Sequence, residues 1–306
     1  MENRRYHGKV ILFGEYSMIF GSEALLIPYE AVYGEWSSVI NRPSERAFDS
    51  NKNIYKLYNY IIENERFRIL DLRRFEMELN AGLFFDSNIR EGYGIGSSGA
   101  LVAAIYDRYK LVDIEDIDRL RRFLAEMENY FHGSSSGIDP LQCYIGEPFI
   151  MSCRPTFDGQ QSAFDKLSHD FISEDIHIFL IDTKIKSQTG PLVEHFKELR
   201  NDISYLDRFN NEYVPIVSRC ISSLVEKDDE GFFMNLSCLS KLQHELLSHT
   251  IPEGFKDLFL KDINKDGFQV KLCGAGGGGF LLGFCKDIEA TNELHRSSGL
   301  KITWIK

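Results

Sequence analysis

The sequence predicts a protein of mixed α and β structure, of the α+β or α/β class, that is divided into two domains. Its 306 residues exceed the length at which a single hydrophobic core usually stops growing. Hydrophobic residues make up 43% of the chain and charged residues 26%, an ordinary balance for a globular protein. Segments with helical spacing and segments with strand patterns occur in both halves of the chain, and this mixture gives the class.

Four segments of the first half carry clear patterns. Residues 9–13 (KVILF) are an apolar run that ends at Gly14 and predict a buried strand. Residues 54–62 have apolar and aromatic side chains at helical spacing, whereas residues 74–79 (RFEMEL) alternate and predict a strand with one wet face. Residues 97–109 are rich in Ala and Leu and follow a glycine-rich turn, so we expect a helix there.

The helix predicted for residues 113–131 has the strongest pattern in the chain. Its apolar residues recur every three or four positions, with Arg and Glu between them. They are Ile114, Ile117, Leu120, Phe123, Leu124, Met127 and Phe131. Such a stripe is typical of a helix that packs against a core, and we interpret it in that way.

The second half begins after a polar segment. Residues 158–173 are polar and aperiodic, and we place the domain boundary near Ser173, which divides the chain into domains of residues 1–173 and 174–306. Residues 176–181 (IHIFLI) then predict a continuous apolar strand. Three helical patterns follow, over residues 191–206, 214–225 and 232–247. Three strand-like runs come last, over residues 269–273, 280–284 and 302–305.

The charge balance and the cysteine pattern argue against several classes of function. The formal net charge is −11, from 35 basic and 46 acidic residues, which argues against nucleic acid and anionic membranes as main partners. None of the six cysteines forms a C-x-x-C pair or lies near His at metal-ligand spacing, so we expect reduced thiols and no zinc site. We find no apolar stretch of about 18 residues and no signal-peptide core, and we therefore expect a cytoplasmic protein that spans no membrane.

Three glycine-bearing segments are candidates for function, and the first is residues 91–100 (EGYGIGSSGA). Its glycines let the backbone approach a ligand closely, and the following helix presents its positive N-terminal end. Backbone N–H groups can then converge on phosphate oxygens, with the hydroxyls of Ser97 and Ser98 beside them. A plain glycine turn capped by serine is the simpler alternative. The segment also fits G-x-G-x-x-G, but polar residues precede it where the dinucleotide fingerprint requires an apolar strand.

The second segment, residues 131–140 (FHGSSSGIDP), fits the G-x-S-x-G pattern of serine hydrolases around Ser135. A nucleophile elbow needs a strand before the serine, whereas the chain arrives here from the predicted helix of residues 113–131. We therefore set the hydrolase aside without excluding it. The other alternative is a helix that ends at Gly133, followed by a polar loop in which Asp139 is only a turn residue before a proline.

The third segment, residues 274–279 (GAGGGG), lies between two apolar runs. Ordering so many glycines costs more conformational entropy than a hairpin would require, roughly 0.5–1 kcal/mol each against alanine. Such a run indicates backbone that packs closely against a bulky group or against another glycine-rich loop.

Taken in order, these segments resemble the motifs of the GHMP kinase family, which includes galactokinases, homoserine kinases, mevalonate kinases and phosphomevalonate kinases. Residues 8–16 (GKVILFGEY) are similar to the first motif, residues 91–100 to the second, phosphate-binding motif, and residues 271–279 (KLCGAGGGG) to the third. Within the family, GKVILFGE and HGSSSGID are most similar to mevalonate kinases. The resemblance implies two α+β domains with the active site in the cleft between them.

The resemblance further implies a kinase that uses ATP and Mg²⁺. It implies that Asp139 is the catalytic aspartate and Lys9 the active-site lysine. It also implies that Glu128 and Ser98 bind the magnesium ion. We expect the nucleotide to bind through the second segment, at Gly92, Gly94, Gly96, Ser97, Ser98 and Gly99.

The same resemblance indicates which residues contact an acceptor alcohol. Glu15 and Tyr16 match positions of substrate contacts, and Thr189 matches a substrate-side threonine. We expect Gly276 and Gly277 of the third segment to bind substrate as well. Mevalonate, converted to 5-phosphomevalonate, is the acceptor that we expect first. The partners that we expect are this small molecule and ATP, and the sequence leaves a homodimer open.

Several departures from the family pattern affect substrate choice and loop stiffness. Tyr16 stands where mevalonate kinases usually have histidine, and tyrosine there is more like phosphomevalonate kinases. Ser135 replaces a usual proline, and Cys273 replaces a hydroxyl residue. Arg90 and Glu91 stand where proline is common.

Two other functions therefore stay open. One is a phosphomevalonate kinase or a sugar kinase of the same family. The other is a ligand sensor with this fold but without catalysis. A sensor would tolerate loss of the catalytic base or of the metal ligand, whereas Lys9, Glu128 and Asp139 are all present.

Overall fold

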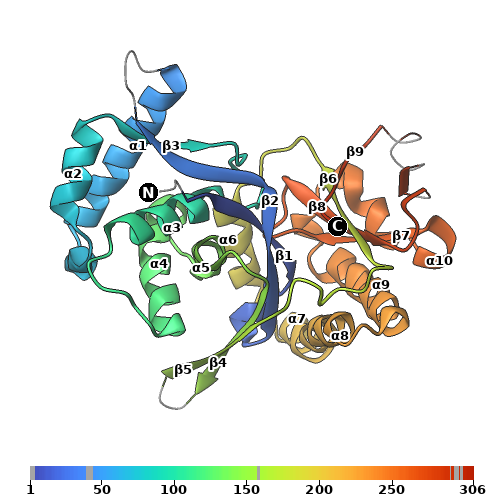
Figure 1. Ribbon diagram of the computed structural model, residues 1–306. Helices are drawn as coiled ribbons and strands as arrows, with labels where there is room; N and C mark the ends of the chain where they lie inside the picture. Colours follow the sequence, from blue (N-terminus) through green and yellow to red (C-terminus); the bar gives the residue numbers. More distant parts are fainter. Residues whose placement is uncertain (1–3, 39–43, 157–158, 290, 293–295, 297–298) are drawn as a thin grey trace. The chain divides into compact units, whose positions relative to one another are not determined.

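The computed structural model describes residues 1–306 except 1–3, 39–43, 157–158, 290, 293–295 and 297–298 (Figure 1). The chain forms two compact units that interleave along the sequence. Unit 1 consists of residues 1–9, 28–91 and 95–146, and unit 2 of residues 10–27, 92–94 and 147–306. The predicted boundary near Ser173 divides the chain only once, and the assignment of residues 1–173 and 174–306 as domains stays a prediction.

Unit 1 is built mainly of helices, with an antiparallel strand pair beside them (Figure 1). The second half of strand β2 (Glu23–Ser38) pairs with β3 (Leu83–Ser87), and helix α1 (Glu45–Ile62) packs on β3. The other helices are α2 (Leu72–Asn80), α3 (Ser97–Tyr109), α4 (Ile117–His132) and α5 (Ile138–Ile145). Both α4 and α5 pack against α3, so α3 is central to this unit.

Three of the predicted helices are confirmed in this unit, as α1, α3 and α4. Helix α4 begins at Ile117 rather than at residue 113, because the Asp116 side chain accepts a hydrogen bond from the Arg119 N–H at 2.7 Å and caps the helix. It ends before Gly133, whose φ of 71° is the left-handed cap that the sequence predicts. The middle of the apolar stripe on α4 faces the core, with Leu124 and Met127 fully buried, whereas Phe131 at its end is 39% exposed.

The strand predicted for residues 74–79 is wrong, because these residues lie in helix α2. The segment alternates, but Phe75 and Leu79 are also four residues apart, and both are buried on one face of the helix. Met77, which the alternation assigns to the buried face, is 63% exposed. Asp71 starts the helix by accepting a hydrogen bond from the Arg74 N–H at 2.9 Å.

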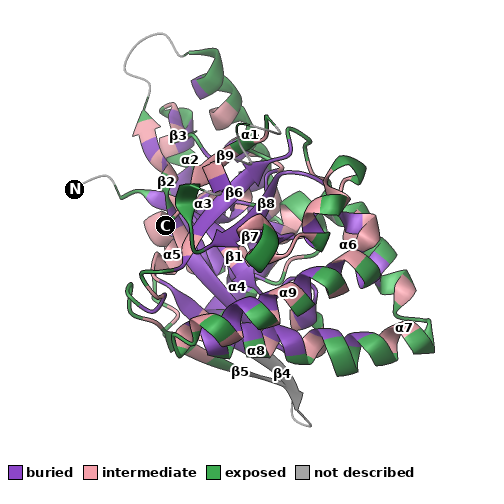
Figure 2. Cartoon of the chain, turned by 90° about the vertical axis from the view of Figure 1, so that its right-hand side faces the viewer, coloured by how far each residue is buried: buried purple, intermediate pink, exposed green. Residues whose placement is uncertain are grey.

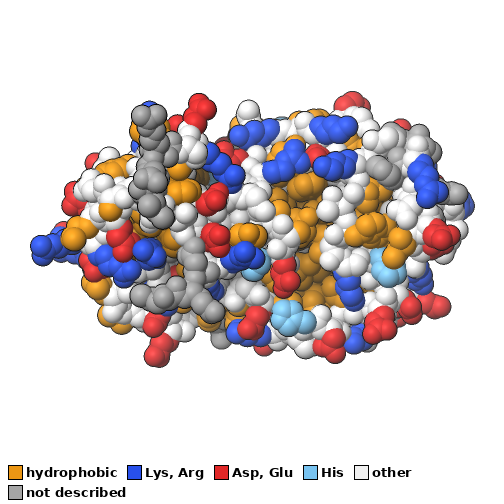
Figure 3. All heavy atoms as spheres, turned by 45° about the horizontal axis from the view of Figure 1, so that its top comes forward, with side chains coloured by type: hydrophobic (Ala, Val, Ile, Leu, Met, Phe, Trp, Pro, Cys, Tyr) orange, Lys and Arg blue, Asp and Glu red, His pale blue; other side chains and the backbone are white. Residues whose placement is uncertain are grey.

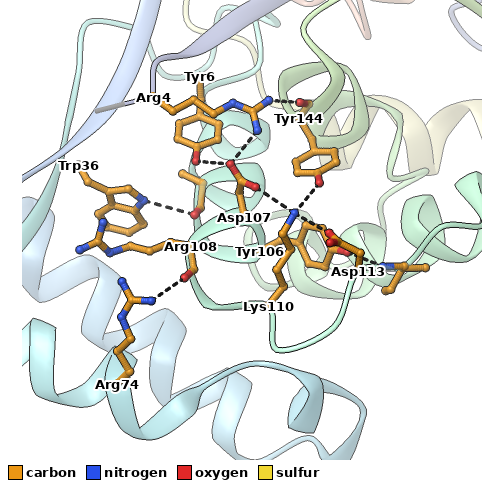
Figure 4. Close-up of polar contacts among 12 residues, drawn as sticks. Arg4, Tyr6, Trp36, Arg74, Tyr106, Asp107, Arg108, Lys110, Asp113 and Tyr144 are labelled. Carbon is orange, nitrogen blue, oxygen red and sulfur yellow. Dashed lines mark hydrogen bonds and ion pairs between the residues drawn. The ribbon is translucent and has the colours of Figure 1, made fainter. Parts of the chain in front are cut away.

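A polar network fastens the N-terminal segment to the C-terminal ends of α3 and α5 (Figure 4). The Asp107 carboxylate accepts hydrogen bonds from the Tyr6 hydroxyl at 2.8 Å and from the Arg4 guanidinium at 2.7 Å. Arg4 also donates to the backbone oxygen of Tyr144. Lys110 donates to the Tyr144 hydroxyl at 2.9 Å and lies 3.2 Å from Asp107. We call these five residues the Asp107 network.

Unit 2 contains an antiparallel four-stranded sheet in the order β7-β8-β6-β9. The strands are β6 (His177–Asp182), β7 (Phe268–Leu272), β8 (Phe280–Cys285) and β9 (Lys301–Trp304). All four confirm predicted strands. Every residue of β7 and β8 is buried, and the core of this unit lies at these strands (Figure 2).

A second sheet has strands that continue from one unit into the other. Its order is β1-β2-β4-β5, with β3 also paired to β2. Strand β1 (Tyr6–Phe13) confirms the strand predicted at residues 9–13. In unit 2 the first residues of β2 pair with β4 (Phe149–Thr156), which pairs with β5 (Gly159–Lys166). The polar segment predicted at residues 158–173 therefore begins with a strand.

The helices of unit 2 follow the predicted patterns, with one interruption. They are α6 (Thr189–Leu199), α7 (Ile203–Arg208), α8 (Val214–Val225), α9 (Asp229–Leu246) and the short α10 (Ile263–Asp266). The pattern over residues 191–206 is divided between α6 and α7. Helix α8 packs on α9, and α9 packs on β7. Short turns of 3-10 or π helix occur at Ser17–Phe20, Glu65–Ile69, Phe209–Tyr213, Ser248–Thr250 and Glu253–Leu260.

The surface mixes charged and apolar side chains, as the face drawn in Figure 3 illustrates. Leu111 and Val112, for example, are neighbours that are 63% and 68% exposed. Exposed apolar residues are ordinary on soluble domains and need no partner to explain them. Among the described residues, no helix has the length and apolar character that crossing a membrane requires.

Candidate active site

The glycine-rich segment leads into helix α3 in the way that an anion-binding loop requires. Gly96 occupies the N-cap position with φ of 86°, a left-handed conformation that residues with a side chain rarely adopt. Ser97, Ser98 and Gly99 form the first turn of the helix. The first N–H groups of a helix have no partner within it, and they carry its positive partial charge. This end of α3 therefore suits a negatively charged group.

Two other glycines of the predicted loop, Gly92 and Gly94, belong to unit 2. Both have left-handed backbones, with φ of 75° and 71°. A Cβ on Gly92 would lie 2.5 Å from the Cγ of Lys186, and one on Gly94 would lie 3.1 Å from the backbone oxygen of Cys273. The predicted nucleotide-binding residues are thus divided between the two units.

Gly99 allows the backbone of α3 to meet the start of α5. A Cβ at Gly99 would lie 2.9 Å from the carbonyl carbon of Asp139 and 3.0 Å from the nitrogen of Pro140, which is closer than real Cβ contacts. Asp139 is in the first turn of α5, as Gly99 is in the first turn of α3. The N-terminal ends of two helices therefore meet at Asp139.

Lys9 reaches the same point from strand β1. Its Nζ lies 2.8 Å from the Oδ1 of Asp139, and its side chain is 1% exposed, whereas that of Asp139 is 33% exposed. The Lys9 N–H donates to the backbone oxygen of Ile95 at 3.0 Å, which joins β1 to the residue before Gly96. A buried ammonium needs a negative partner, and Asp139 supplies one that is still open to solvent.

Glu128 extends from α4 and is buried beside this pair. Its Oε1 accepts a hydrogen bond from the Ser98 hydroxyl at 2.9 Å, and its Oε2 accepts one from the Ser135 hydroxyl. Burial, together with the nearby charge of Asp139, raises the pKa of Glu128 to about 7. The structure thus brings together Lys9, Asp139, Glu128 and Ser98, which the sequence separates by up to 130 positions.

His132 is a member of this cluster that the sequence analysis did not single out. Its Nε2 lies 3.1 Å from the Oγ of Ser98. Burial lowers the pKa of His132, and the charge of Asp139 opposes that effect. A signal was present in the sequence, because Glu128 and His132 are four residues apart on one helix and so share a face.

The predicted acceptor residue Glu15 belongs to unit 2, where it pairs with a lysine of the third glycine-bearing motif. The Nζ of Lys271 donates to the Oε1 of Glu15, and both side chains are buried. Burial raises the pKa of Glu15, while the charge of Lys271 opposes the shift. A separation of 256 positions hid this partner from the sequence analysis.

Tyr16 has a strained backbone and an anchored hydroxyl. Its φ is 59°, which is unusual for a residue with a bulky side chain. Its hydroxyl donates to the backbone oxygen of Ala275 at 2.7 Å, and its ring lies 4.6 Å from that of Phe196. Burial raises the pKa of Tyr16, so the hydroxyl stays protonated and can donate this bond.

The third glycine-bearing segment packs closely against backbone within unit 2, as its composition indicates. The Gly277 N–H donates to the backbone oxygen of Thr250 at 2.5 Å, and a Cβ on Gly276 would lie 2.4 Å from that same oxygen. The Ser187 hydroxyl donates to the backbone oxygen of Gly276. Thr189 is the first residue of α6, and its side chain lies outside the described part of the structure.

The chain is similar to known proteins over most of its length. Residues 54–147 match the family model for the N-terminal domain of GHMP kinases. The mevalonate kinase of Archaeoglobus fulgidus is 24% identical to this chain over 288 residues, which are 91% of this chain and 90% of that protein. The chain is therefore similar to the GHMP kinase family.

Solved structures share the fold of this chain. L. major mevalonate kinase, solved in complex with R-mevalonate, has a TM-score of 0.67 at 17% identity and covers 97% of this chain and 90% of its own. Streptococcus pneumoniae phosphomevalonate kinase, solved with phosphomevalonate and AMPPNP, has a TM-score of 0.67 at 16% identity and covers 99% of this chain and 100% of its own. The predicted α+β fold is confirmed, while a site in a cleft between domains stays a prediction.

The geometry disfavours the two alternatives that the glycine patterns raised. The residues before the first glycine segment include β3, which is antiparallel to β2, whereas a dinucleotide fingerprint follows a parallel strand. Ser135 follows helix α4 rather than a strand, and its hydroxyl donates to Glu128. Neither arrangement is that of a dinucleotide-binding turn or of a nucleophile elbow.

Proposed function

We propose that this protein is a kinase that transfers the γ-phosphoryl group of ATP to the hydroxyl of a small-molecule alcohol, and that mevalonate is that alcohol. The observation that carries the proposal is the pair of Lys9 and Asp139, 2.8 Å apart where the N-terminal ends of α3 and α5 meet. A carboxylate that can take a proton, together with a buried ammonium and helix N-termini that stabilise negative charge, suits phosphoryl transfer to an alcohol.

Asp139 is the proposed general base. An alcohol is a poor nucleophile at neutral pH, and a carboxylate within hydrogen-bond reach can take its proton as the bond to phosphorus forms. Asp139 is suited to this because a third of its side chain is exposed while Lys9 keeps a positive charge beside it. Lys9 also stabilises negative charge on the transferring phosphoryl group, since a fixed charge in a site of low polarity needs no reorganisation.

The first turn of α3 is the proposed phosphate site. The N–H groups of Ser97, Ser98 and Gly99 point along the helix axis toward its N-terminal side, where an anion is stabilised. Gly96 provides the left-handed turn that brings the loop backbone to this end. ATP is the proposed donor because the family is a kinase family and because a relative of the same fold was solved with AMPPNP.

Glu128 and Ser98 are the proposed Mg²⁺ ligands, and their chemistry fits that ion. Mg²⁺ takes hard oxygen ligands and is usually held by one or two carboxylates together with phosphate oxygens and water. Glu128 is buried with a pKa raised to about 7, so a nearby cation would offset the cost of ionising it. When bound, Mg²⁺ would neutralise charge on the phosphate oxygens.

The choice of mevalonate rests on the relatives and on residues of unit 2. Several curated relatives carry the name mevalonate kinase, including those from Archaeoglobus fulgidus and Pyrococcus abyssi. A second candidate, phosphomevalonate, is favoured by Tyr16, which is more typical of phosphomevalonate kinases. Two contacts argue against phosphomevalonate. The Tyr16 hydroxyl already donates a hydrogen bond to the backbone oxygen of Ala275, and the Tyr16 ring packs against the ring of Phe196 rather than against a cationic side chain.

A coupled ADP-release assay over mevalonate, phosphomevalonate, galactose and homoserine tests the proposal. We expect MgATP-dependent turnover with the highest kcat/KM for mevalonate. A kcat/KM ten-fold higher for phosphomevalonate would overturn the acceptor assignment and leave the kinase. Binding of mevalonate in calorimetry without ADP release from any acceptor would instead identify a sensor.

A further inference from the structure

The Glu128 carboxylate is held at both of its oxygens, by hydroxyls from two different segments. Ser98 donates to Oε1 from the first turn of α3, and Ser135 donates to Oε2 from the loop between α4 and α5. Any rotation of the carboxylate about its last torsion would lengthen at least one of these bonds. Glu128 is 3% exposed, so water cannot readily replace either hydroxyl.

The Ser135 hydroxyl is itself held in place, so it can hold the Glu128 carboxylate in one orientation. Its hydroxyl has one proton, which goes to Glu128, and its oxygen accepts a hydrogen bond from the Gly137 N–H at 2.9 Å. The loop is tied to α4 a second time, because Arg121 donates to the backbone oxygen of Ser136 at 2.6 Å. Gly137 has φ of 76°, and a Cβ there would lie 2.1 Å from the backbone oxygen of Arg121. The loop therefore has little freedom to move Ser135 away.

A carboxylate held in this way favours one mode of cation binding. Each of its oxygens has lone pairs beyond the one that a serine hydroxyl uses, so either can still contact a cation. Bidentate coordination of a cation by both oxygens would require the carboxylate to rotate, and this rotation would weaken its hydrogen bonds with both serine hydroxyls. Ca²⁺ commonly takes both oxygens of a carboxylate and tolerates irregular geometry, whereas Mg²⁺ is smaller and takes single oxygens in near-octahedral geometry.

We propose that Ser135 is a positioning residue for the divalent cation and sets the preference of this site for Mg²⁺ over Ca²⁺. The inference rests on the proposed function, because that function assigns Glu128 to the cation. Ser135 acts only through Glu128, whereas Ser98 is placed at the cation itself. Groups that orient a metal ligand typically change metal affinity about 10–100-fold when they are removed.

Calorimetry of a non-hydrolysable ATP analogue, titrated in excess Mg²⁺, in excess Ca²⁺ and in EDTA, tests this without any turnover. For the unaltered protein we expect the gain in nucleotide affinity over EDTA to be larger with Mg²⁺ than with Ca²⁺. Ser135→Ala should lose about ten-fold or more of the Mg²⁺ gain, so that the Mg²⁺ to Ca²⁺ ratio falls toward one. Ser135→Thr keeps the hydroxyl and should stay within about three-fold of the unaltered protein.

Two further variants separate the possible failures. Ser134→Ala is the matched control, because Ser134 is exposed and its hydroxyl has no hydrogen bond among the described residues. Glu128→Gln should lose most of the gain in nucleotide affinity that Mg²⁺ gives over EDTA. If Glu128→Gln keeps that gain, the metal assignment within the proposed function is wrong. If Glu128→Gln loses the gain while folded Ser135→Ala keeps the unaltered ratio, only the present inference is overturned. The inference is also overturned if Ser135→Thr behaves like Ser135→Ala, since the effect would then be one of loop packing.

Discussion

Helix α3 has a polar cluster at each end, and each cluster contains a buried or half-buried carboxylate. The fold favours the ionised form of one carboxylate and the protonated form of the other. At its C-terminal end, burial alone would raise the pKa of Asp107, but the hydrogen bond from Tyr6 and the charge of Arg4 outweigh burial and lower it. At its N-terminal end, burial and the charge of Asp139 raise the pKa of Glu128 to about 7. One carboxylate is more acidic than an isolated one, and the other is less acidic.

The difference separates a structural cluster from a candidate active site. Asp107 is surrounded by donors and cations, and its ionised form stabilises the fold. Glu128 is accompanied by a second carboxylate and its nearest cation, Lys9, is paired with that carboxylate. Perturbation of this kind concentrates at functional sites, because the groups are arranged for a ligand rather than for one another. The comparison predicts that changes at the N-terminal end alter catalysis and changes at the C-terminal end alter stability.

The largest effect that we expect is on turnover. Asp139→Asn removes the proposed base and Lys9→Met the proposed charge beside it, so each should lower kcat at least a hundred-fold. The affinity for MgATP should change only a few-fold. If the two residues act as one unit, as proposed, the double variant should be little worse than the poorer single one. Steady-state kinetics and nucleotide calorimetry measure both quantities.

Stability should survive these changes, and this is the test of the comparison. Asp139→Asn removes the negative charge that disfavours ionised Glu128, and this gain offsets part of the cost of leaving buried Lys9 without its carboxylate partner, so the protein should stay folded. A folded Asp139→Asn protein that retains more than about a tenth of kcat would show that Asp139 is not the base. Asp139 would then be a turn residue before Pro140.

At the other end of α3, Asp107→Ala should act on folding instead. It removes the common acceptor of Tyr6, Arg4 and Lys110, and should lower the free energy of unfolding by about 1–3 kcal/mol. Turnover should stay within about three-fold, because Asp107 lies at the opposite end of α3 from the proposed phosphate site and its partners are Tyr6, Arg4 and Lys110. Urea denaturation and kinetics provide the two measurements.

The matched control for this variant is Asp113→Ala. Asp113 also pairs with Lys110, but its side chain is 68% exposed, so its removal should cost less than about 1 kcal/mol. A loss of kcat greater than ten-fold in Asp107→Ala would show that the two ends of α3 are coupled.

The sequence predicted elements well where a single period dominated. Helix α4 was recognisable because Leu124 and Met127 belong to one uninterrupted stripe, and β8 because it is continuously apolar. Helix α2 was missed because Phe75 and Leu79 fit both a period of two and a spacing of four. Local pattern alone could not decide between them.

The candidate site was predictable only in part, and for a different reason. Lys9, Asp139 and Glu128 were found through the resemblance of whole motifs, and the structure brings them together within unit 1. The residues that hydrogen-bond to predicted site residues and hold them in place were not found. Ser135 was considered as a hydrolase nucleophile and as a departure from the family pattern but not as a partner of Glu128, and Lys271 lies 256 positions from Glu15. Such contacts form only when distant segments meet in the folded chain, and no periodic pattern in the sequence indicates them.

A further difference should distinguish two glycines that share a backbone conformation. Gly96 and Gly133 have φ of 86° and 71°, so alanine strains the backbone at both. A Cβ at Gly96 would lie 2.9 Å from the Cγ of Lys9, whereas at Gly133 it would meet nothing within 4 Å. Gly96→Ala should therefore destabilise the protein by about 1–3 kcal/mol more than Gly133→Ala. It should also weaken MgATP binding, which Gly133→Ala should leave unchanged.

Denaturant melts and MgATP calorimetry on both variants check this expectation. Equal destabilisation by the two variants would show that the side chain of Lys9 can move aside at no cost. Unchanged MgATP affinity in a folded Gly96→Ala protein would argue against the phosphate-loop assignment.

The last prediction concerns the pH dependence of stability in the metal-free protein. In the unfolded chain Glu128 titrates near its ordinary pKa of 4.5, and in the folded protein burial and Asp139 raise that pKa to about 7. Between these values the unfolded state has lost the proton and the folded state still holds it. The folded state then binds more protons, so the contribution of Glu128 to stability falls as the pH rises from about 4.5 to 7. Asp107 has the opposite sign, because its lowered pKa gives stability that is present above its ordinary value of 3.8 and lost as the pH falls below it.

Glu128→Gln isolates the contribution of Glu128, because glutamine fills similar space and does not titrate. Urea denaturation in EDTA at pH 5 and at pH 7 should show the unaltered protein losing about 1–2 kcal/mol more than Glu128→Gln over this interval. Asp107→Asn should lower stability by the same amount at pH 5 and at pH 7, which leaves the difference over this interval unaffected, and its deficit against the unaltered protein should shrink only toward pH 3. Parallel pH profiles for the unaltered protein and Glu128→Gln would mean that Glu128 ionises as easily in the fold as outside it. The contrast between the two ends of α3 would then be one of position rather than of electrostatics.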